Sequence, residues 1–204
     1  MDSILDIEKN TLIEEAKAYC EEQGFEIVFT HEISATNLQV ISERTKNLPA
    51  MFHANVGMLL DRLKNGCYLL RKDGEIYGHI FAHRHVVDKF SVYERSALWI
   101  HDAHRNHNLG LLLMDLLSQN FRKDFLISIA QEPTVHQNNL LLGMKFVTLK
   151  DLSPVLISTL EKLGKLRDEL KYKYYVNPYF ESKLNQINKI LKSKIPNIPN
   201  TPNT

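Results

Sequence analysis

Apolar positions recur along the chain with two periods, one typical of helices and one typical of strands. Segments with apolar residues every three or four positions predict helices, and short segments that alternate or are continuously apolar predict strands. We therefore expect helices over 8–22, 37–46, 52–64, 109–120, 133–142, 154–170 and 180–193, strands over 25–33, 92–101, 124–131, 145–149 and 172–176, and a β-hairpin over 67–87.

Local signals support several of these boundaries. Asp73 and Gly74 lie between two strand-like runs, and Asp-Gly is a strong signal for a tight hairpin turn. Ser153 and Pro154 are typical of a helix N-cap followed by the first helical residue. Ser34 is a suitable cap for the helix predicted over 37–46.

The order of elements predicts the fold class and the domain organisation. Helices, an antiparallel hairpin and then alternating strands and helices indicate a mixed α/β domain with a central sheet. We divide the chain into an N-terminal helix over 1–24, the α/β domain over 25–177 and a C-terminal extension over 178–204. The extension combines a polar helix with a tail rich in Pro and Asn, which we expect to be disordered.

Composition narrows the functional classes. The 204 residues carry a formal net charge of +1, so we expect neither a nucleic-acid partner nor an anionic membrane surface. The first residues, MDSILDIEKN, do not resemble a signal peptide, and no apolar run is long enough for a membrane span. Cys20 and Cys67 are expected to be reduced thiols, which together with these features predicts a cytoplasmic protein.

A polar turn over 102–108 connects a predicted strand to a leucine-rich helix. The N–H groups at the start of a helix lack internal partners and bind phosphate well. Arg105 adds a cation suited to bidentate contact, Asn108 tolerates a positive φ, and Gly110 allows a ligand to approach the backbone. These residues predict a pyrophosphate-binding loop. A polar loop that only caps a buried helix is an equally simple interpretation.

Other ligands for this turn are less well supported. Neither GxxxxGK[ST] nor GxGxxG after a strand is present, so the sequence does not indicate a P-loop or a dinucleotide-binding Rossmann site. His101, His104 and His107 have a spacing of three, which raises the alternative of a histidine-ligated metal. That alternative leaves Arg105 and Gly110 unexplained, so we predict no metal.

The segment Arg105–Gly110 resembles the Q/R-x-x-G-x-G/A signature of the GNAT acetyltransferase superfamily. Asn108 stands where the signature has its first glycine. The run 143–146, GMKF, is similar to the "GF" that closes the second cofactor motif of the superfamily. The resemblance covers about residues 25–176. It implies the GNAT fold, a mixed, mostly antiparallel central sheet flanked by helices.

The resemblance also implies acetyl-CoA as the co-substrate. In the superfamily, the fourth strand separates from the fifth, and its free backbone groups pair with pantetheine. The matching residues are Leu98, Trp99 and Ile100. Asn138 or Asn139 would touch the cofactor arm, with Asn139 preferred. The pyrophosphate would lie against the side chain of Arg105 and the amides of Asn106, His107, Asn108, Leu109, Gly110 and Leu111.

Glu94 is the residue that the resemblance implies as general base. Some superfamily members carry a glutamate on the fourth strand, eleven residues before the signature, and Glu94 is eleven residues before Arg105. Regular alternation would place it on one strand face with apolar neighbours that raise its pKa. The set expected on that face is Val92, Glu94, Ser96, Leu98 and Ile100. The alternative is an ordinary edge-strand carboxylate paired with Arg95 or Lys89.

The proton donor for the leaving thiolate is not identified by the sequence. Many GNAT enzymes have a tyrosine four residues before the glycine of "GF", where this chain has Asn139. Tyr93 or a water molecule is a possible substitute. His79, His83 and His85 share a predicted strand face with Tyr77 and Phe81, and are candidate bases or acceptor contacts. A partly buried polar strand face is the simpler interpretation.

The sequence therefore predicts an acetyl-CoA-dependent N-acetyltransferase that transfers the acetyl group directly to a primary amine. The alternative is a GNAT-shaped domain that binds CoA or a partner protein without catalysis, which the missing glycine and tyrosine would favour. A histidine-ligated metal protein is the third hypothesis. The acceptor is not specified, and the C-terminal extension is compatible with packing on the domain or with a homodimer.

Overall fold

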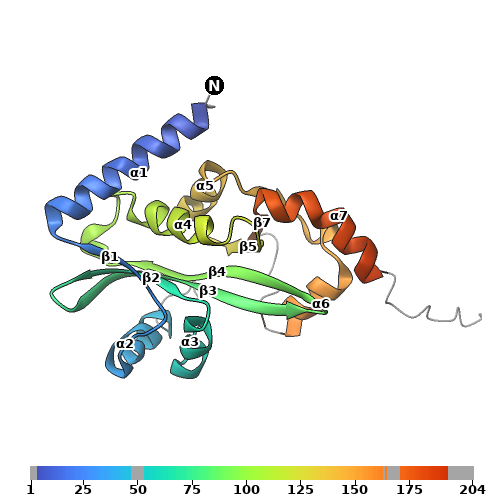
Figure 1. Ribbon diagram of the computed structural model, residues 1–204, viewed down its shortest axis with the longest axis horizontal. Helices are drawn as coiled ribbons and strands as arrows, with labels where there is room; N and C mark the ends of the chain where they lie inside the picture. The colour runs from blue at the N-terminus through green and yellow to red at the C-terminus, as the bar shows by residue number, and fades with distance from the viewer. Residues whose placement is uncertain (1–3, 47–52, 163, 165–170, 193–204) are drawn as a thin grey trace, which may run out of the picture.

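A twisted seven-stranded sheet forms the centre of the protein (Figure 1). The computed structural model describes residues 4–46, 53–162, 164 and 171–192. The strands lie in the order β1-β2-β3-β4-β5-β7-β6. Their bounds are Glu26–Thr30 (β1), Cys67–Lys72 (β2), Glu75–Val87 (β3), Phe90–Ile100 (β4), Phe125–Ala130 (β5), Lys145–Val147 (β6) and Lys173–Val176 (β7).

Helices cover the sheet on both sides (Figure 1). In Figure 1, α1, α4 and α5 lie on one side, which we call the α4 face, and α2 and α3 lie on the other, the α3 face. The helices are α1 (Ile4–Gln23), α2 (Ala35–Lys46), α3 (Val56–Leu63), α4 (Leu109–Asn120), α5 (Pro133–Leu141), α6 (Pro154–Lys162) and α7 (Pro178–Lys192). The architecture confirms the predicted mixed α/β fold with a central, mostly antiparallel sheet.

Several predicted signals have the expected geometry. Asp73 and Gly74 both have positive φ, at 51° and 82°, and form the two-residue turn between β2 and β3. The Ser34 hydroxyl accepts a hydrogen bond from the Asn37 amide at the start of α2. Helix α3 begins later than predicted, because the Asn55 side chain caps it by accepting from the Met58 amide.

Two predictions fall partly or wholly outside the described residues. The helix expected over 154–170 is described as α6 up to Lys162, and residues 165–170 lie outside that description. The tail beyond residue 192, which we expect to be disordered, lies outside it as well. Within the described ranges, no helix has the length and apolar character needed to cross a membrane.

Helix α4 is buried between the sheet and α1. Its apolar residues point in nearly all directions, which is typical of a helix covered on several sides. Ala16 and Cys20 of α1 share a core cluster with Leu109 and Leu112 of α4, so the N-terminal helix packs on the same core as the sheet. At the opposite end, Phe180 of α7 joins a second cluster built with α6. The C-terminal helix therefore packs on the domain.

The two cysteines are free and buried in separate clusters. Burial raises the pKa of Cys20 to about 11, with a smaller contribution from the charge of Glu21. Burial alone raises the pKa of Cys67 to about 12. Both thiols are therefore protonated near neutral pH and act as small apolar side chains.

Candidate functional site

Strands β4 and β5 are parallel neighbours over only part of their length. Val92–Arg95 pairs with Phe125–Ser128, and the pairing ends there. Beyond Arg95, β4 continues to Ile100 paired only with β3, while β5 continues to Ala130 paired only with β7. The backbone of β4 over 96–100 therefore presents one unpaired edge toward the gap between the two strands.

A β-bulge lies where the two strands separate. On β4, Ser96 pairs with Phe81 and Trp99 pairs with His79, so Ala97 and Leu98 together oppose the single residue Ile80. Ala97 has a φ of 51°, which is unfavourable for a residue with a Cβ by roughly 1 kcal/mol. A bulge of this kind bends its strand and interrupts the regular ladder at the extra residue.

The bulge overturns one prediction about side-chain direction. Regular alternation places Leu98 and Ile100 on the same face as Glu94. Instead, Leu98 and Ile100 pack with the leucines of α4, while Glu94 lies on the α3 face. The extra residue shifts the two-residue period by one, so all side chains after it change face. Trp99 is consequently brought to the α3 face, beside His79.

The face predicted for Tyr77 is wrong because β3 contains a second bulge. Between β2 and β3 the register shifts, because Leu70 pairs with Gly78 whereas Arg71 pairs with Ile76. Tyr77 is the extra residue and packs in the cluster of α1 and α4, near Phe25. It therefore does not share the face of the β3 histidines.

His79, on the neighbouring strand β3, stabilises the bulge of β4 through its side chain. Its Nδ1 donates a hydrogen bond of 2.7 Å to the carbonyl oxygen of Ala97, and its ring stacks on Trp99. The ring is fully buried, and burial lowers its pKa to about 3, with further lowering by the charges of Arg44 and Arg62. His79 is therefore neutral at physiological pH, and only one of its ring nitrogens carries a proton to donate.

The loop after β4 has the backbone shape that the phosphate hypothesis requires. Asn106 and Asn108 both have positive φ, at 67° and 56°, and Asn108 is the N-cap of α4 without a side-chain capping bond. The first helical hydrogen bond runs from the Leu112 amide to the Asn108 carbonyl. The amides of the first helical residues, 109–111, therefore precede the helical ladder and point toward the loop.

Gly110 lies in the first turn of α4 with ordinary helical backbone geometry. A Cβ built on it would be 3.8 Å from the nearest atom, on Leu98, which is normal van der Waals contact. Internal packing therefore does not demand a glycine here. A glycine is useful at this position if an external group approaches the helix backbone closely.

Arg105 lies at the rim of the same loop. Its Nε donates to the carbonyl oxygen of Ile100 at 3.3 Å, and its guanidinium forms an ion pair with Asp102 at 2.7 Å. Both side chains are largely exposed, so the ion pair contributes little stability and is easily exchanged for another anion. The arginine is thus held close to the unpaired end of β4.

Helix α1 contacts this loop directly. The Tyr19 ring stacks on His107 with centroids 3.8 Å apart, and its hydroxyl hydrogen-bonds the Nδ1 of His104. The Glu15 carboxylate accepts a hydrogen bond from the side-chain amide of Asn108 at 3.4 Å. The N-terminal helix therefore fixes the loop and places one negative charge beside it.

The loop histidines are occupied by these contacts. His101 accepts from the Ala103 amide, while His104 and His107 contact Tyr19. Burial lowers the pKa of His104, and the charges of His101, His107 and Lys72 lower it further. In the described part of the chain, these three residues do not form a group whose ligand atoms converge as a metal site requires.

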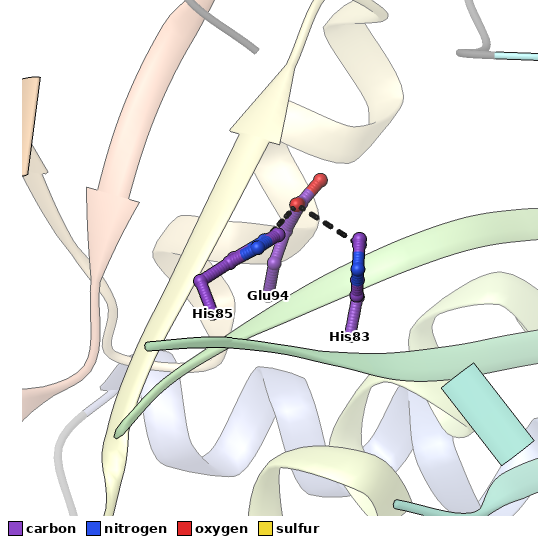
Figure 2. A group of neighbouring side chains, drawn as sticks. All are labelled: His83, His85 and Glu94. Carbon is purple, nitrogen blue, oxygen red and sulfur yellow. Dashed lines mark hydrogen bonds and ion pairs between the residues drawn. The ribbon is translucent and has the colours of Figure 1, made fainter. Parts of the chain in front are cut away.

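Glu94 is the centre of a buried cluster on the α3 face. Its side chain belongs to β4, and only 3% of the residue is exposed. Figure 2 shows that His83 and His85, both from β3, point toward its carboxylate. The Nε2 of His85 donates to Oε2 of Glu94 at 2.7 Å, and the Nδ1 of His83 lies 4.0 Å from the same oxygen.

The antiparallel pairing of β3 and β4 brings these residues together. His83 pairs with Glu94 and His85 pairs with Val92, so both rings flank the glutamate on one sheet face. The hydrogen bond from His85 fixes the carboxylate orientation. The arrangement can hold Glu94 as a proton acceptor, with the His83 imidazole close beside it.

These three residues are also the best candidates for metal ligands within the described residues, since their ligand atoms all lie within 4.8 Å of one another. Two features oppose a divalent cation. His85 and Glu94 already satisfy each other through a hydrogen bond. The guanidinium of Arg62 interacts electrostatically with Glu94, so a metal ion would place further positive charge beside a buried arginine.

Two arginines that the sequence analysis did not single out lie on the same face of the sheet. Arg62, on α3, is 1% exposed and interacts with the charge of Glu94. Arg44, on α2, places its guanidinium 3.9 Å from the centroid of the Trp99 ring. A signal for Arg62 was present, because it lies on the apolar stripe of α3 beside Leu59 and Leu63.

Asn139 has a different environment from the predicted cofactor contact. It is fully buried on α5, and its side-chain oxygen accepts a hydrogen bond from Arg95. Arg95 also donates to Ser118 and lies against Met144, so it links β4 to α4 and α5. This geometry favours a structural role for Asn139. Its contact with the cofactor stays a prediction.

Tyr93 lies on the opposite side of the sheet from Glu94. Its ring packs against Phe121, with centroids 4.5 Å apart, and against the cluster of Leu126 and Tyr175. Arg95 lies on the same α4 face, so it does not pair with Glu94. Tyr93 is therefore poorly placed to give a proton to a group held beside Glu94.

The candidate site of this chain combines a separated β4/β5 pair, a bulge at the separation and a loop of free amides at the start of the next helix. Solved structures align with about three quarters of the chain. N-acetylglutamate synthase from Neisseria gonorrhoeae, complexed with coenzyme A and N-acetyl-glutamate, aligns with 74% of this chain at a TM-score of 0.56 and 12% identity. The chain has the GNAT fold.

Two other solved structures align with the same share of the chain. Rv2747 from Mycobacterium tuberculosis, in complex with CoA, has a TM-score of 0.53 and 13% identity, and 98% of it is covered. NAA60 from Arabidopsis thaliana, in complex with a bisubstrate analogue, has a TM-score of 0.52 and 10% identity, and 97% of it is covered. Both alignments cover 74% of this chain.

The similarity to GNAT structures is one of fold and covers only part of some of the matching proteins. The alignment spans only 35% of the N. gonorrhoeae synthase, so this chain corresponds to about a third of that protein. The sequence matches no protein-family model and no curated protein. The GNAT fold is therefore recognised from the arrangement of the backbone, at identities between 10% and 13% among these three matches.

Proposed function

We propose that the protein is an acetyl-CoA-dependent N-acetyltransferase that transfers the acetyl group directly to a primary amine. One observation carries the proposal: the unpaired edge of β4 leads directly into a loop of free amides at the start of α4. The GNAT structures crystallised with CoA or acetyl-CoA support the co-substrate. The acceptor class is a separate question.

The residues around the β4/β5 gap fit both ends of the pantetheine-pyrophosphate chain. The free backbone edge of Leu98, Trp99 and Ile100 offers donors and acceptors to an amide-containing chain that lies along it, as an added strand would. The amides from Asn106 to Leu111 and the side chain of Arg105 offer donors to a pyrophosphate. These positions are the proposed co-substrate site.

The transfer requires a neutral amine. Its nitrogen attacks the thioester carbonyl carbon, the carbon–sulfur bond breaks, and the amine loses a proton. We assign Glu94 as the acceptor of that proton, directly or through water, with His85 holding the carboxylate in place. The leaving thiolate takes a proton from water, because Tyr93 lies on the other sheet face.

The burial of Glu94 is the observation that favours the non-catalytic alternative. A carboxylate that is 3% exposed and bonded to His85 is also what a structural polar cluster would show. In that case the protein binds CoA, or a partner, through the same loop without turnover. Binding and catalysis are therefore tested separately.

The first experiment is calorimetric titration of acetyl-CoA and CoA into the wild-type protein and into Arg105→Ala and Gly110→Trp variants. We expect micromolar binding to the wild type, weakening of about tenfold or more in Arg105→Ala, and loss of binding in Gly110→Trp. Arg84→Ala is the control, since Arg84 is exposed and bonds only Ser91 among the described contacts. A folded wild-type sample that binds neither ligand would contradict the proposal.

A further inference from the structure

Two helices bring positive charge to the face of the sheet that holds Glu94. Arg44 from α2 covers the Trp99 ring. Arg62 from α3 is more deeply buried than Arg44 and interacts electrostatically with Glu94. Trp99 is at the end of β4 where the proposed co-substrate chain passes. The two guanidinium groups therefore lie on the acceptor side of the proposed site.

Both guanidinium groups have unsatisfied donors. Nε and Nη2 of Arg62 and Nη1 of Arg44 are buried and have no hydrogen-bond partner among the described residues. Over the same residues, no carboxylate is within ion-pair distance of either side chain, although eight other ion pairs are formed. Buried, unpaired arginine donors are costly and rare, so these donors call for a partner beyond the described residues.

The charges around these arginines specify the kind of partner. Arg44 and Arg62 are positive, Glu94 is negative when it acts as a base, and His79 is neutral, so the group carries an excess of one positive charge. Two further carboxylates interact with these arginines, Glu75 with Arg44 and Asp61 with Arg62. Both are exposed to solvent and therefore screened, and Asp61 is paired with Lys64. A single negative charge would balance the group, which favours a carboxylate over a phosphate dianion.

A carboxylate also matches the geometry of the donors. Its two coplanar oxygens accept parallel hydrogen bonds from one guanidinium, and its remaining lone pairs can accept from a second. Lysine would not offer this fork, so the presence of arginine at both positions is informative. Arg44 is partly exposed and Arg62 is fully buried, so the arginines form an outer and an inner contact.

We propose that the amine acceptor carries a carboxylate, as a free amino acid does, and that Arg44 and Arg62 bind that carboxylate while Glu94 faces the amine. This inference rests on the proposed acetyltransferase function and names the substrate class of that same site. The amine and carboxylate of one small molecule would thus meet the negative and positive groups of the α3 face respectively.

The experiment compares matched acceptors. The L-amino acids, their carboxamides and the amines that lack the carboxylate are each incubated with acetyl-CoA and the full-length protein, and CoA release is measured. We expect at least about a tenfold preference in kcat/KM for one or more amino acids over the matching carboxamide. Binding of the same acceptors in the presence of CoA is measured by calorimetry.

Variants identify the arginines as the cause. Arg44→Gln and Arg62→Met should each raise KM for the preferred amino acid by about 10- to 100-fold and leave KM for acetyl-CoA unchanged, with Arg44→Lys intermediate. The same substitutions should lower kcat/KM for the carboxamide much less than for the amino acid, so the preference for the carboxylate is lost. Arg84→Gln, an exposed arginine on β3, is the matched control. Arg44→Gln keeps the test valid if Arg62→Met fails to fold.

The outcomes separate this inference from the proposed function. Equal use of amino acids and carboxamides, or arginine variants that retain the preference, would overturn the carboxylate site while the acetyltransferase function stands. A protein that binds acetyl-CoA but neither acetylates nor binds any amino acid would also overturn it. Failure to bind acetyl-CoA at all would instead remove the proposed function on which the inference rests.

Discussion

The Nδ1 of His79 donates a hydrogen bond of 2.7 Å to the carbonyl oxygen of Ala97, and this bond joins β3 to the bulge of β4. Ala97 has a left-handed backbone conformation that a residue with a Cβ rarely adopts. The bond from a buried, neutral imidazole compensates for part of that strain. It also keeps the edge of β4 open where the proposed co-substrate would lie.

This relationship predicts a dependence of stability on pH. Burial lowers the pKa of His79 to about 3, whereas an unfolded histidine has a pKa near 6.5. The unfolded state therefore binds the proton more readily, so protonation of this histidine favours unfolding. The free energy of unfolding should not depend on His79 above about pH 6.5, and should fall by up to ~1.4 kcal/mol per pH unit as the pH decreases from there toward 3. Urea unfolding at several pH values between 4 and 7 measures it.

The variant His79→Gln isolates the contribution of this residue. Glutamine can donate to the Ala97 carbonyl but does not titrate, so its free energy of unfolding should fall less steeply with decreasing pH than that of the wild type. Curves with the same slope for both proteins would mean that other groups cause the acid sensitivity.

Glu94→Gln should separate catalysis from binding. The amide keeps the size of the carboxylate and can still accept from His85, but it cannot take a proton. We expect kcat to fall by about 10²- to 10³-fold, with CoA affinity unchanged. Steady-state kinetics and calorimetry on the same sample measure both. Glu26→Gln, an exposed carboxylate on β1, serves as control, and a Glu94→Gln enzyme with normal turnover would exclude Glu94 as the base.

Asn108 can be tested against the glycine that the GNAT signature has at this position. Its φ of 56° suits asparagine and glycine but not a β-branched residue. Asn108→Gly should change the free energy of unfolding by less than ~1 kcal/mol and retain CoA binding. Asn108→Val should lose about 1–2 kcal/mol and bind CoA more weakly. Thermal unfolding and calorimetry report the two effects, and equal behaviour of Gly and Val would contradict the proposed backbone role.

Glu15 places a negative charge beside the proposed pyrophosphate loop, through its contact with Asn108. Glu15→Gln should therefore tighten CoA binding by about two- to fivefold at low ionic strength, with a smaller gain at high salt. The neighbouring Glu14, which pairs with Lys17, provides the control substitution Glu14→Gln. If both variants bind CoA like the wild type at low salt, the loop does not hold the phosphates.

Local chemistry made much of this fold predictable. The Asp73-Gly74 turn and helix α4, Leu109–Asn120, follow from turn residues and from the run of leucines. The polar connection over 102–108 was predictable as a turn between a strand and a helix, while its role in binding phosphate stays a prediction. Each of these signals is complete within a short stretch of chain, so tertiary structure was not needed to interpret it.

The parts that were wrong or missed depend on pairing between distant residues. The bulge at Ala97 exists only because Ser96 and Trp99 pair with residues two apart on β3, and no local signal marks it. The contact between His85 and Glu94 depends on the same register. Arg44 meets Trp99 across a helix–sheet interface. Such relationships require the relative placement of elements, which a single sequence specifies only through packing.

The bulge of β4 also constrains how this region can change in length. Because side chains alternate along a strand, the single extra residue at Ala97 gives Glu94 and Trp99 the same face although five positions separate them. An insertion or deletion of one residue between them would turn Trp99 toward α4 and away from Arg44. Length changes in this segment are therefore tolerated only in even numbers, a parity rule that sequence variants of this protein should obey.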